Sequence, residues 1–122
     1  MKTIVVADDD PVSRELIREV LEGQGYRMVE AIDGALALST VRMMNPDLVL
    51  LDIRMPVLDG FGVLEALRQE DRFREIPIFA LTAFAMHGDR ERALAAGFDD
   101  YITKPIRISA LRERINLVLA PD

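Results

Sequence analysis

Short apolar runs alternate with longer segments of helical period along the chain, and this alternation limits the possible folds more than any other feature. Strands that helices cover on both faces read as continuous apolar runs, whereas antiparallel strands usually alternate apolar and polar residues. The alternation therefore predicts an α/β domain with a parallel sheet between two helical layers. The second and fifth apolar runs are the more polar, so we expect them at the sheet edges. The five predicted strands are residues 3–7, 26–31, 47–51, 76–81 and 100–103.

Five helices are expected between and after these strands. The first is the clearest, because Asp10 suits the N-cap and Pro11 suits the first helical position. Its inward face is predicted to carry Val12, Leu16, Ile17, Val20 and Leu21. The last helix is predicted to turn Leu111, Ile115 and Val118 inward. The expected helices are residues 11–23, 34–44, 60–70, a fourth that starts between 85 and 89 and ends at 97, and 108–119.

The size and composition predict a single soluble domain over residues 1–122. Half of the residues are hydrophobic and 30% are charged, which is the balance of a globular protein. No apolar run is long enough to insert into a membrane, the N-terminal run is too short for a secretory signal and cysteine is absent. We therefore expect a cytoplasmic protein. The net charge of -6 argues against direct nucleic-acid binding, because phosphate backbones are bound by clustered Lys and Arg.

Polar side chains follow four of the five predicted strands. Asp8 and Asp9 follow the first strand, and Asp52 comes at the end of the third. Thr82 follows the fourth strand and Lys104 follows the fifth. Taken singly, each has an ordinary explanation as a helix cap, a strand-end threonine or a surface lysine. In an open α/β sheet, ligands bind beyond the carboxyl ends of the strands, so we expect the five side chains to converge at one edge.

The chemistry of this set points to a magnesium ion and to phosphoryl transfer. Three neighbouring carboxylates repel one another, and a bound cation relieves the repulsion. Magnesium is the expected ion because it takes oxygen ligands and often binds together with a phosphate. A carboxylate with a pKa of roughly 3.9 is ionised at pH 7 and acts as a nucleophile without a general base. An ammonium and a hydroxyl would then hold the phosphoryl oxygens.

The segments ADDDP, LLDIRMPVLDG, ALTA and ITKP, in this order and spacing, resemble the hallmark motifs of receiver domains in two-component response regulators. The resemblance covers essentially the whole chain. It implies that Asp52 accepts the phosphoryl group, that Asp9 binds Mg²⁺ directly and that Asp8 acts through water. It also implies that the backbone carbonyl of Arg54 completes the metal site.

The same resemblance implies a flavodoxin-like sheet in the order 2-1-3-4-5 and a switch driven by phosphorylation. Thr82 matches the switch hydroxyl, Tyr101 the switch aromatic and Lys104 the conserved-type lysine of the catalytic site. The bond from Lys104 to Pro105 is expected to be cis. The stretch from Thr82 to Ile106 most resembles single-domain cell-polarity regulators and the receivers of hybrid kinases.

The implied partners are a phosphate donor and a downstream protein. The donor would be a phosphohistidine on a histidine kinase or on a histidine phosphotransfer protein. The downstream protein would read the surface of the fourth helix, fifth strand and fifth helix, including Phe84, Arg107 and Arg112. Such a domain is not an enzyme in the usual sense, because it catalyses only its own phosphorylation and dephosphorylation.

Three alternative functions differ from this prediction at identifiable residues. A phosphotransferase of the haloacid-dehalogenase type needs an aspartate two residues after the nucleophile, where this chain has Arg54. A flavodoxin needs a phosphate loop rich in Ser, Thr and Gly, where this chain has aspartates. A pseudo-receiver that only binds proteins would not need the complete set of site residues. His87, the single histidine, is expected to be a turn residue and not a ligand.

Overall fold

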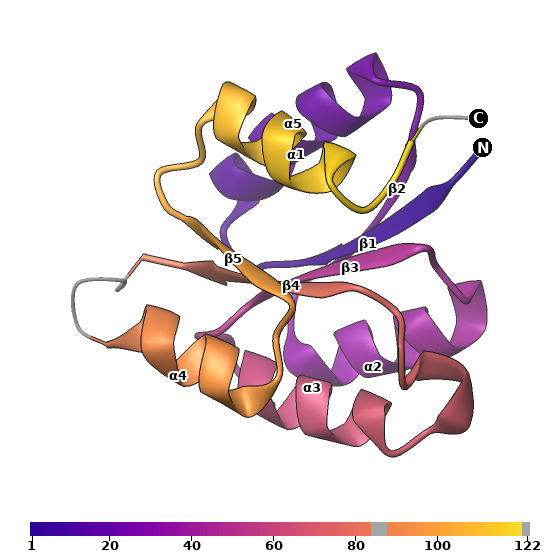
Figure 1. Cartoon of the computed structure of the whole chain (residues 1–122), viewed down its shortest axis with the longest axis vertical. Coiled ribbons are helices and arrows are strands. Elements are labelled where there is room, and N and C mark those ends of the chain that lie inside the picture. Colours follow the sequence, from indigo (N-terminus) through magenta and orange to yellow (C-terminus); the bar gives the residue numbers. More distant parts are fainter. Residues whose placement is uncertain (84–87, 121–122) are drawn as a thin grey trace.

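The computed structural model describes residues 1–83 and 88–120, which form one parallel sheet between two layers of helices (Figure 1). The strand order is β2-β1-β3-β4-β5, so the predicted flavodoxin-like order and both predicted edge strands are confirmed. The strands are β1 Thr3–Ala7, β2 Arg27–Ala31, β3 Leu48–Asp52, β4 Ile78–Thr82 and β5 Asp100–Thr103. The helices are α1 Pro11–Gly23, α2 Gly34–Met44, α3 Gly60–Arg68, α4 Asp89–Ala96 and α5 Ile108–Asn116, with a 3-10 turn at Asp71–Phe73.

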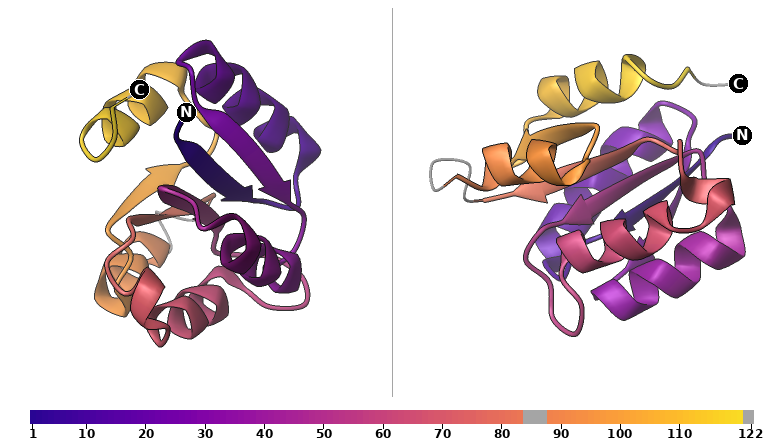
Figure 2. Two further views of the ribbon diagram at one scale, coloured as in Figure 1. Left: turned by 90° about the vertical axis from the view of Figure 1, so that its right-hand side faces the viewer. Right: turned by 60° about the horizontal axis from the view of Figure 1, so that its bottom comes forward.

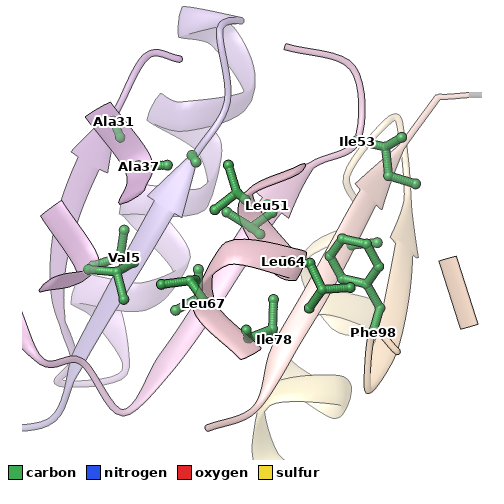
Figure 3. Close-up of a cluster of buried hydrophobic side chains, with 14 of the residues drawn as sticks. Val5, Ala31, Ala37, Leu51, Ile53, Leu64, Leu67, Ile78 and Phe98 are labelled. Atoms are coloured by element: carbon green, nitrogen blue, oxygen red, sulfur yellow. The ribbon is translucent and has the colours of Figure 1, made fainter. Parts of the chain in front are cut away.

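Two hydrophobic cores lie on the two faces of the sheet. Helices α1 and α5 cover one face, and α2, α3 and α4 cover the other (Figures 1 and 2). Consecutive residues of a central strand point to opposite faces, so Ile4 packs under α1 and α5 while Val5 packs under α2 and α3. Both faces are buried, and this explains why the central strands are apolar throughout. Figure 3 shows the core on the face covered by α2, α3 and α4, where strand residues such as Leu51 and Ile78 lie near Leu64 and Leu67 of α3.

Aspartate caps start three of the helices directly after the loops that follow the strands. The Asp10 carboxylate accepts a hydrogen bond from the Val12 N–H at 3.0 Å, and Pro11 occupies the first turn as predicted. Asp33 and Asp59 cap α2 and α3 in the same way. Each such cap contributes roughly 1 kcal/mol to helix stability. After β1 and β2, the chain turns from strand to capped helix within a few residues.

Two predicted strand ends move outward by one residue, and the shift bears on the site. Asp52 pairs with Leu81 across β3 and β4, and Thr82 pairs with Thr103 across β4 and β5. Both polar residues are therefore the last residues of strands and are not loop residues. The sheet ladder holds their backbones, and this fixes the direction in which each side chain leaves the sheet.

Two apolar residues were wrongly predicted to point inward. Val12 is 73% exposed, because successive helical residues turn by 100° and Ser13, one turn before Ile17, takes the inward position. Val118 is 43% exposed because α5 ends at Asn116 and the helical period ends with it. The apolar pattern overestimated the width of the first inward face and the length of the last helix.

The loop between β3 and α3 turns tightly beside Asp52. Val57 has φ +72°, and the Leu58 N–H closes the turn by donating to the Pro56 carbonyl at 2.8 Å. A Cβ on Gly60 would lie 2.6 Å from the carbonyl oxygen of Asp52. Gly60 is thus required by the close approach of α3 to the end of β3.

Two further backbone predictions concern the loop between β5 and α5 and the start of α4. The peptide bond between Lys104 and Pro105 is cis, as predicted. Helix α4 begins at Asp89, the latest of the predicted starts. His87 and Phe84 lie outside the described residues. Within residues 1–83 and 88–120, none of the helices has the length and apolarity that a membrane crossing requires.

Candidate functional site

Three strands bring Asp8, Asp52 and Lys104 together at the carboxyl edge of the sheet. Asp8 follows β1, Asp52 ends β3 and Lys104 follows β5. The Lys104 ammonium donates to Asp52 Oδ2 at 2.8 Å and to Asp8 Oδ1 at 3.1 Å. Asp8 is fully buried and Asp52 is 5% exposed. The structure confirms that Asp8, Asp52 and Lys104 converge as predicted.

Asp9 adds a third carboxylate to this group. One oxygen from each of Asp8, Asp9 and Asp52 lies within 4.8 Å of the others, and only Asp9 is exposed. Asp8 Oδ2 is buried and, although it is 2.9 Å from the Lys104 ammonium, accepts no hydrogen bond of acceptable geometry among the described residues. An all-oxygen donor set with one solvent-facing member and one unsatisfied buried oxygen fits a hard cation that retains some of its waters. The residues present therefore fit magnesium.

Burial and hydrogen bonding have opposite effects on the Asp52 carboxyl. Burial raises its pKa to about 6, and the nearby charge of Asp8 adds to this effect. The hydrogen bonds from the Lys104 ammonium and from the Arg54 backbone N–H, at 3.0 Å, lower the pKa but do not offset burial. Burial also disfavours the charged form of Lys104, but its bonds to Asp52 and Asp8 outweigh this and raise its pKa. At pH 7 both Asp52 and Lys104 are mainly charged. The pKa of Asp52 lies closer to 7 than the ordinary value of roughly 3.9 expected from the sequence.

Thr82 and Tyr101, the two predicted switch residues, lie on neighbouring strands. Thr82 is buried at the end of β4, and its hydroxyl donates to Asp89 Oδ2 at 3.3 Å. Tyr101 lies on β5 beside Ala80 of β4 and is half-buried. Its ring packs under the Arg90 guanidinium, whose central carbon is 4.8 Å from the ring centroid. The Thr82 hydroxyl therefore contacts the start of α4. The Tyr101 ring lies at the surface formed by α4 and β5.

Arg54 and Asp89 extend the site toward α4. The Nε and Nη2 of the Arg54 side chain donate to the two oxygens of Asp89, each at 3.2 Å. Asp89 is fully buried and was not among the predicted site residues. Its sequence position, after Gly88 at the start of a helix, indicated only an acidic residue in a first turn. Two of its partners, Arg54 and Thr82, lie 35 and 7 residues away along the chain.

The first prediction concerns the cost of keeping Asp52 ionised. Its pKa is 3.8 in the unfolded reference and about 6 in the folded chain, so folding favours the neutral carboxyl. Well below pH 3.8 the carboxyl is neutral in both states, so its ionisation does not oppose folding. As the pH rises from about 4 to about 6, the carboxyl ionises first in the unfolded chain, and the wild type loses stability. In metal-free buffer at pH 7, Asp52→Asn should therefore raise the free energy of unfolding by about 1 to 2 kcal/mol, a pKa-linked gain reduced by the weaker bond to Lys104.

Denaturant unfolding at pH 7 and at pH 4 measures this effect. The difference between Asp52→Asn and the wild type should shrink toward zero at pH 4. A variant that is less stable than the wild type at pH 7, or a gain that is unchanged at pH 4, would contradict the assigned cause.

Comparisons with known proteins agree with the fold. The family model of the response regulator receiver domain matches residues 4–116. The polar-differentiation response regulator DivK of Brucella anthropi is 37% identical over 118 residues, which cover 97% of this chain and 96% of that protein. A putative response regulator from Chloroflexus aurantiacus has a TM-score of 0.91 at 30% identity, with 96% of each chain covered.

A further solved structure carries a metal ion. The receiver domain of the sensor histidine kinase PA1611 from Pseudomonas aeruginosa has a magnesium ion coordinated in its active-site cleft. Its TM-score to this chain is 0.89 at 36% identity, with 96% of each chain covered. Members of this family are signalling domains and not classical enzymes. The chain belongs to the response-regulator receiver domains of two-component signalling.

Proposed function

We propose that this chain is a phosphorylation-dependent switch in which Asp52 accepts a phosphoryl group from a phosphohistidine. The observation that carries the proposal is the Asp52 carboxylate, held between the Lys104 ammonium and the acidic pair at the open edge of the sheet. The donor is a histidine kinase or a histidine phosphotransfer protein. In the reaction an Asp52 oxygen bonds to phosphorus, the bond from phosphorus to the imidazole nitrogen breaks, and the imidazole keeps that electron pair.

The residues around Asp52 include the proposed ligands of a magnesium ion. Asp9, Asp52 and the backbone carbonyl of Arg54 would bind Mg²⁺ directly, and Asp8 would support the ion through water. When bound, the ion neutralises the carboxylates and the incoming phosphoryl oxygens. Support for this assignment comes from the three converging carboxylates and from the magnesium in the PA1611 receiver domain.

Lys104 and Thr82 supply the remaining contacts to the phosphoryl group. The Lys104 ammonium already lies 2.8 Å from an Asp52 oxygen, so a phosphoryl group on Asp52 would come within its reach. The Thr82 hydroxyl leaves its present acceptor and donates to a phosphoryl oxygen. Both groups are donors placed where negative charge arrives, which is how proteins stabilise phosphoryl groups.

The output surface is formed by α4, β5 and α5, and we assign it an acidic partner. As Thr82 moves, Tyr101 on the adjacent strand turns inward and changes this surface. A cavity of about 250 Å³ opens there, with the side chains of Arg90, Arg107 and Arg114 in its lining. One of these arginines also binds Asp100. A basic cavity on a chain with a net charge of -6 favours a partner that presents carboxylates.

The proposal extends to the domain as a whole. Residues 1–122 form one receiver unit, which the match over residues 4–116 supports. The cytoplasmic location and the lack of direct nucleic-acid binding stay as predictions. A haloacid-dehalogenase-type reaction is disfavoured because residue 54 is an arginine, where that reaction needs an aspartate.

The second prediction is that Asp52 alone gains a phosphoryl group. Incubation with acetyl phosphate and Mg²⁺, followed by intact-mass measurement, should show one added phosphoryl group on the wild type and none on Asp52→Asn. The matched control is Asp47→Asn, because Asp47 is an exposed aspartate that precedes the opposite end of β3 and bonds to the Thr3 N–H. Labelling of Asp52→Asn at the wild-type rate would refute the assignment, and an unlabelled wild type would favour the pseudo-receiver.

The third prediction is that Mg²⁺ stabilises the folded chain through Asp9. A ligand that binds only the folded state contributes RT ln(1 + [L]/Kd), about 2.7 kcal/mol at a hundredfold excess over Kd. Mg²⁺ should therefore raise the melting temperature of the wild type. Asp9→Asn should abolish this response.

The control for this experiment is Asp10→Asn. Asp10 is exposed, lies outside the carboxylate cluster and caps α1, and asparagine caps helices equally well. Its magnesium response should equal that of the wild type. An undiminished magnesium shift in Asp9→Asn would exclude Asp9 as a ligand.

A further inference from the structure

The carboxylate of Asp89 is the most completely enclosed charge at the start of α4. Its side chain is 1% exposed, and both oxygens accept hydrogen bonds from Arg54. Oδ1 also accepts from Arg92 Nη1 at 3.2 Å, and Oδ2 accepts from the Thr82 hydroxyl at 3.3 Å. An acidic residue that only complemented a helix dipole would have no need of burial or of a threonine. This carboxylate therefore joins the end of β4, the loop after β3 and the first turn of α4.

The hydroxyl of Thr82 carries one proton and can donate only one hydrogen bond at a time. In this structure it donates to Asp89. In the proposed function it donates to a phosphoryl oxygen on Asp52. The two acceptors are both anionic, so they compete for the same proton.

We propose that Asp89 is a positioning residue that holds Thr82 in the resting arrangement and so opposes activation before Asp52 is phosphorylated. This inference rests on the proposed function, because it presupposes that Thr82 moves toward a phosphoryl group. Every active molecule must break the bond from Thr82 to Asp89. The strength of that bond therefore sets part of the equilibrium between resting and active forms.

Arg54 links this hold to the phosphorylation site. Its backbone N–H donates to Asp52 Oδ1 at 3.0 Å, and its side chain grips Asp89 through two parallel hydrogen bonds. A change at Asp52 thus reaches the start of α4 through a single residue. The result is a short path from the phosphoacceptor to one of the elements of the proposed output surface.

The contacts of Asp89 also make its removal tolerable. The side chains of Arg54 and Arg92 are 54% and 62% exposed, so both guanidinium groups remain in contact with water once the carboxylate is gone. Thr82, by contrast, is 1% exposed and loses a buried acceptor. Removing Asp89 should therefore act chiefly on the threonine hydroxyl.

The test compares the affinity of the chain for beryllium trifluoride, a mimic of the phosphoryl group, in the presence of Mg²⁺. Asp89→Ala should bind the mimic about tenfold more tightly than the wild type, since a hydrogen bond to a charged acceptor no longer has to be broken. Amide chemical shifts of Tyr101 in the unliganded variant should move part of the way toward the liganded wild-type values. Glu91→Ala is the matched control, because it removes an exposed carboxylate from the same helical turn.

A second background separates the hydroxyl from simple charge removal. With Thr82→Val in place, Asp89→Ala should no longer change the affinity, because the competing donor is absent. Equal tightening in both backgrounds, or no tightening in a folded Asp89→Ala variant, would overturn the proposal. Should Asp89→Ala fail to fold, Asp89→Asn serves instead, and the weaker neutral acceptor should give a smaller tightening that also depends on Thr82. If the wild type itself binds no mimic, the proposed function is wrong. If the wild type binds the mimic and Asp89→Ala binds it with the same affinity, only the proposed role of Asp89 is wrong.

Discussion

The Lys104 ammonium lies between two buried carboxylates, and the organisation of the site depends on this contact. Buried charges are tolerated only when they are paired and hydrogen-bonded. Lys104 serves both Asp8 and Asp52, at 3.1 and 2.8 Å, although the three residues come from three different strands. One ammonium facing three carboxylates leaves the edge of the sheet with an excess of negative charge. The same arrangement that satisfies the lysine thus creates the demand for a cation, and a cation with open positions is what an incoming phosphoryl group requires.

The second constraint is the position of the Thr82 hydroxyl, the proposed switch group, at the end of a buried strand. The backbone of Thr82 is held by its pairing with Thr103 of β5, so only the side chain can change its partner. Its hydroxyl has a choice of acceptors, and in the resting structure it contacts Asp89. Arg54 joins that carboxylate to Asp52, the proposed phosphoacceptor, so the sheet edge and the surface of α4 and β5 share one hydrogen-bonded network. In this account the switch depends on exchange between acceptors and requires no large rearrangement of the fold.

The order of the edge strands and the convergence of three site residues could be predicted from the sequence, and the structure shows why. Parallel strands end at the same edge, so residues that follow the strands must meet, and Asp8, Asp52 and Lys104 do. The two more polar strands proved to be the edges because only central strands are covered on both faces. Val12 was wrongly predicted to be buried, because apolar character alone does not determine which residues of a helix face the core. Asp89 was missed because its contacts with Arg54 and Thr82 join separate elements of the fold, and no local pattern indicates such contacts.

The central claim is that a divalent cation at the carboxylate cluster prepares Asp52 to hold a phosphoryl group. The most direct measurement is a crystal structure of the chain with Mn²⁺ and beryllium trifluoride, recorded with the anomalous signal of manganese. The account predicts one anomalous peak bound by Asp9, Asp52 and the Arg54 carbonyl, with beryllium attached to an Asp52 oxygen and with Lys104 and Thr82 on its fluorides. A manganese peak away from these residues, or a beryllium adduct on any other carboxylate, would contradict it.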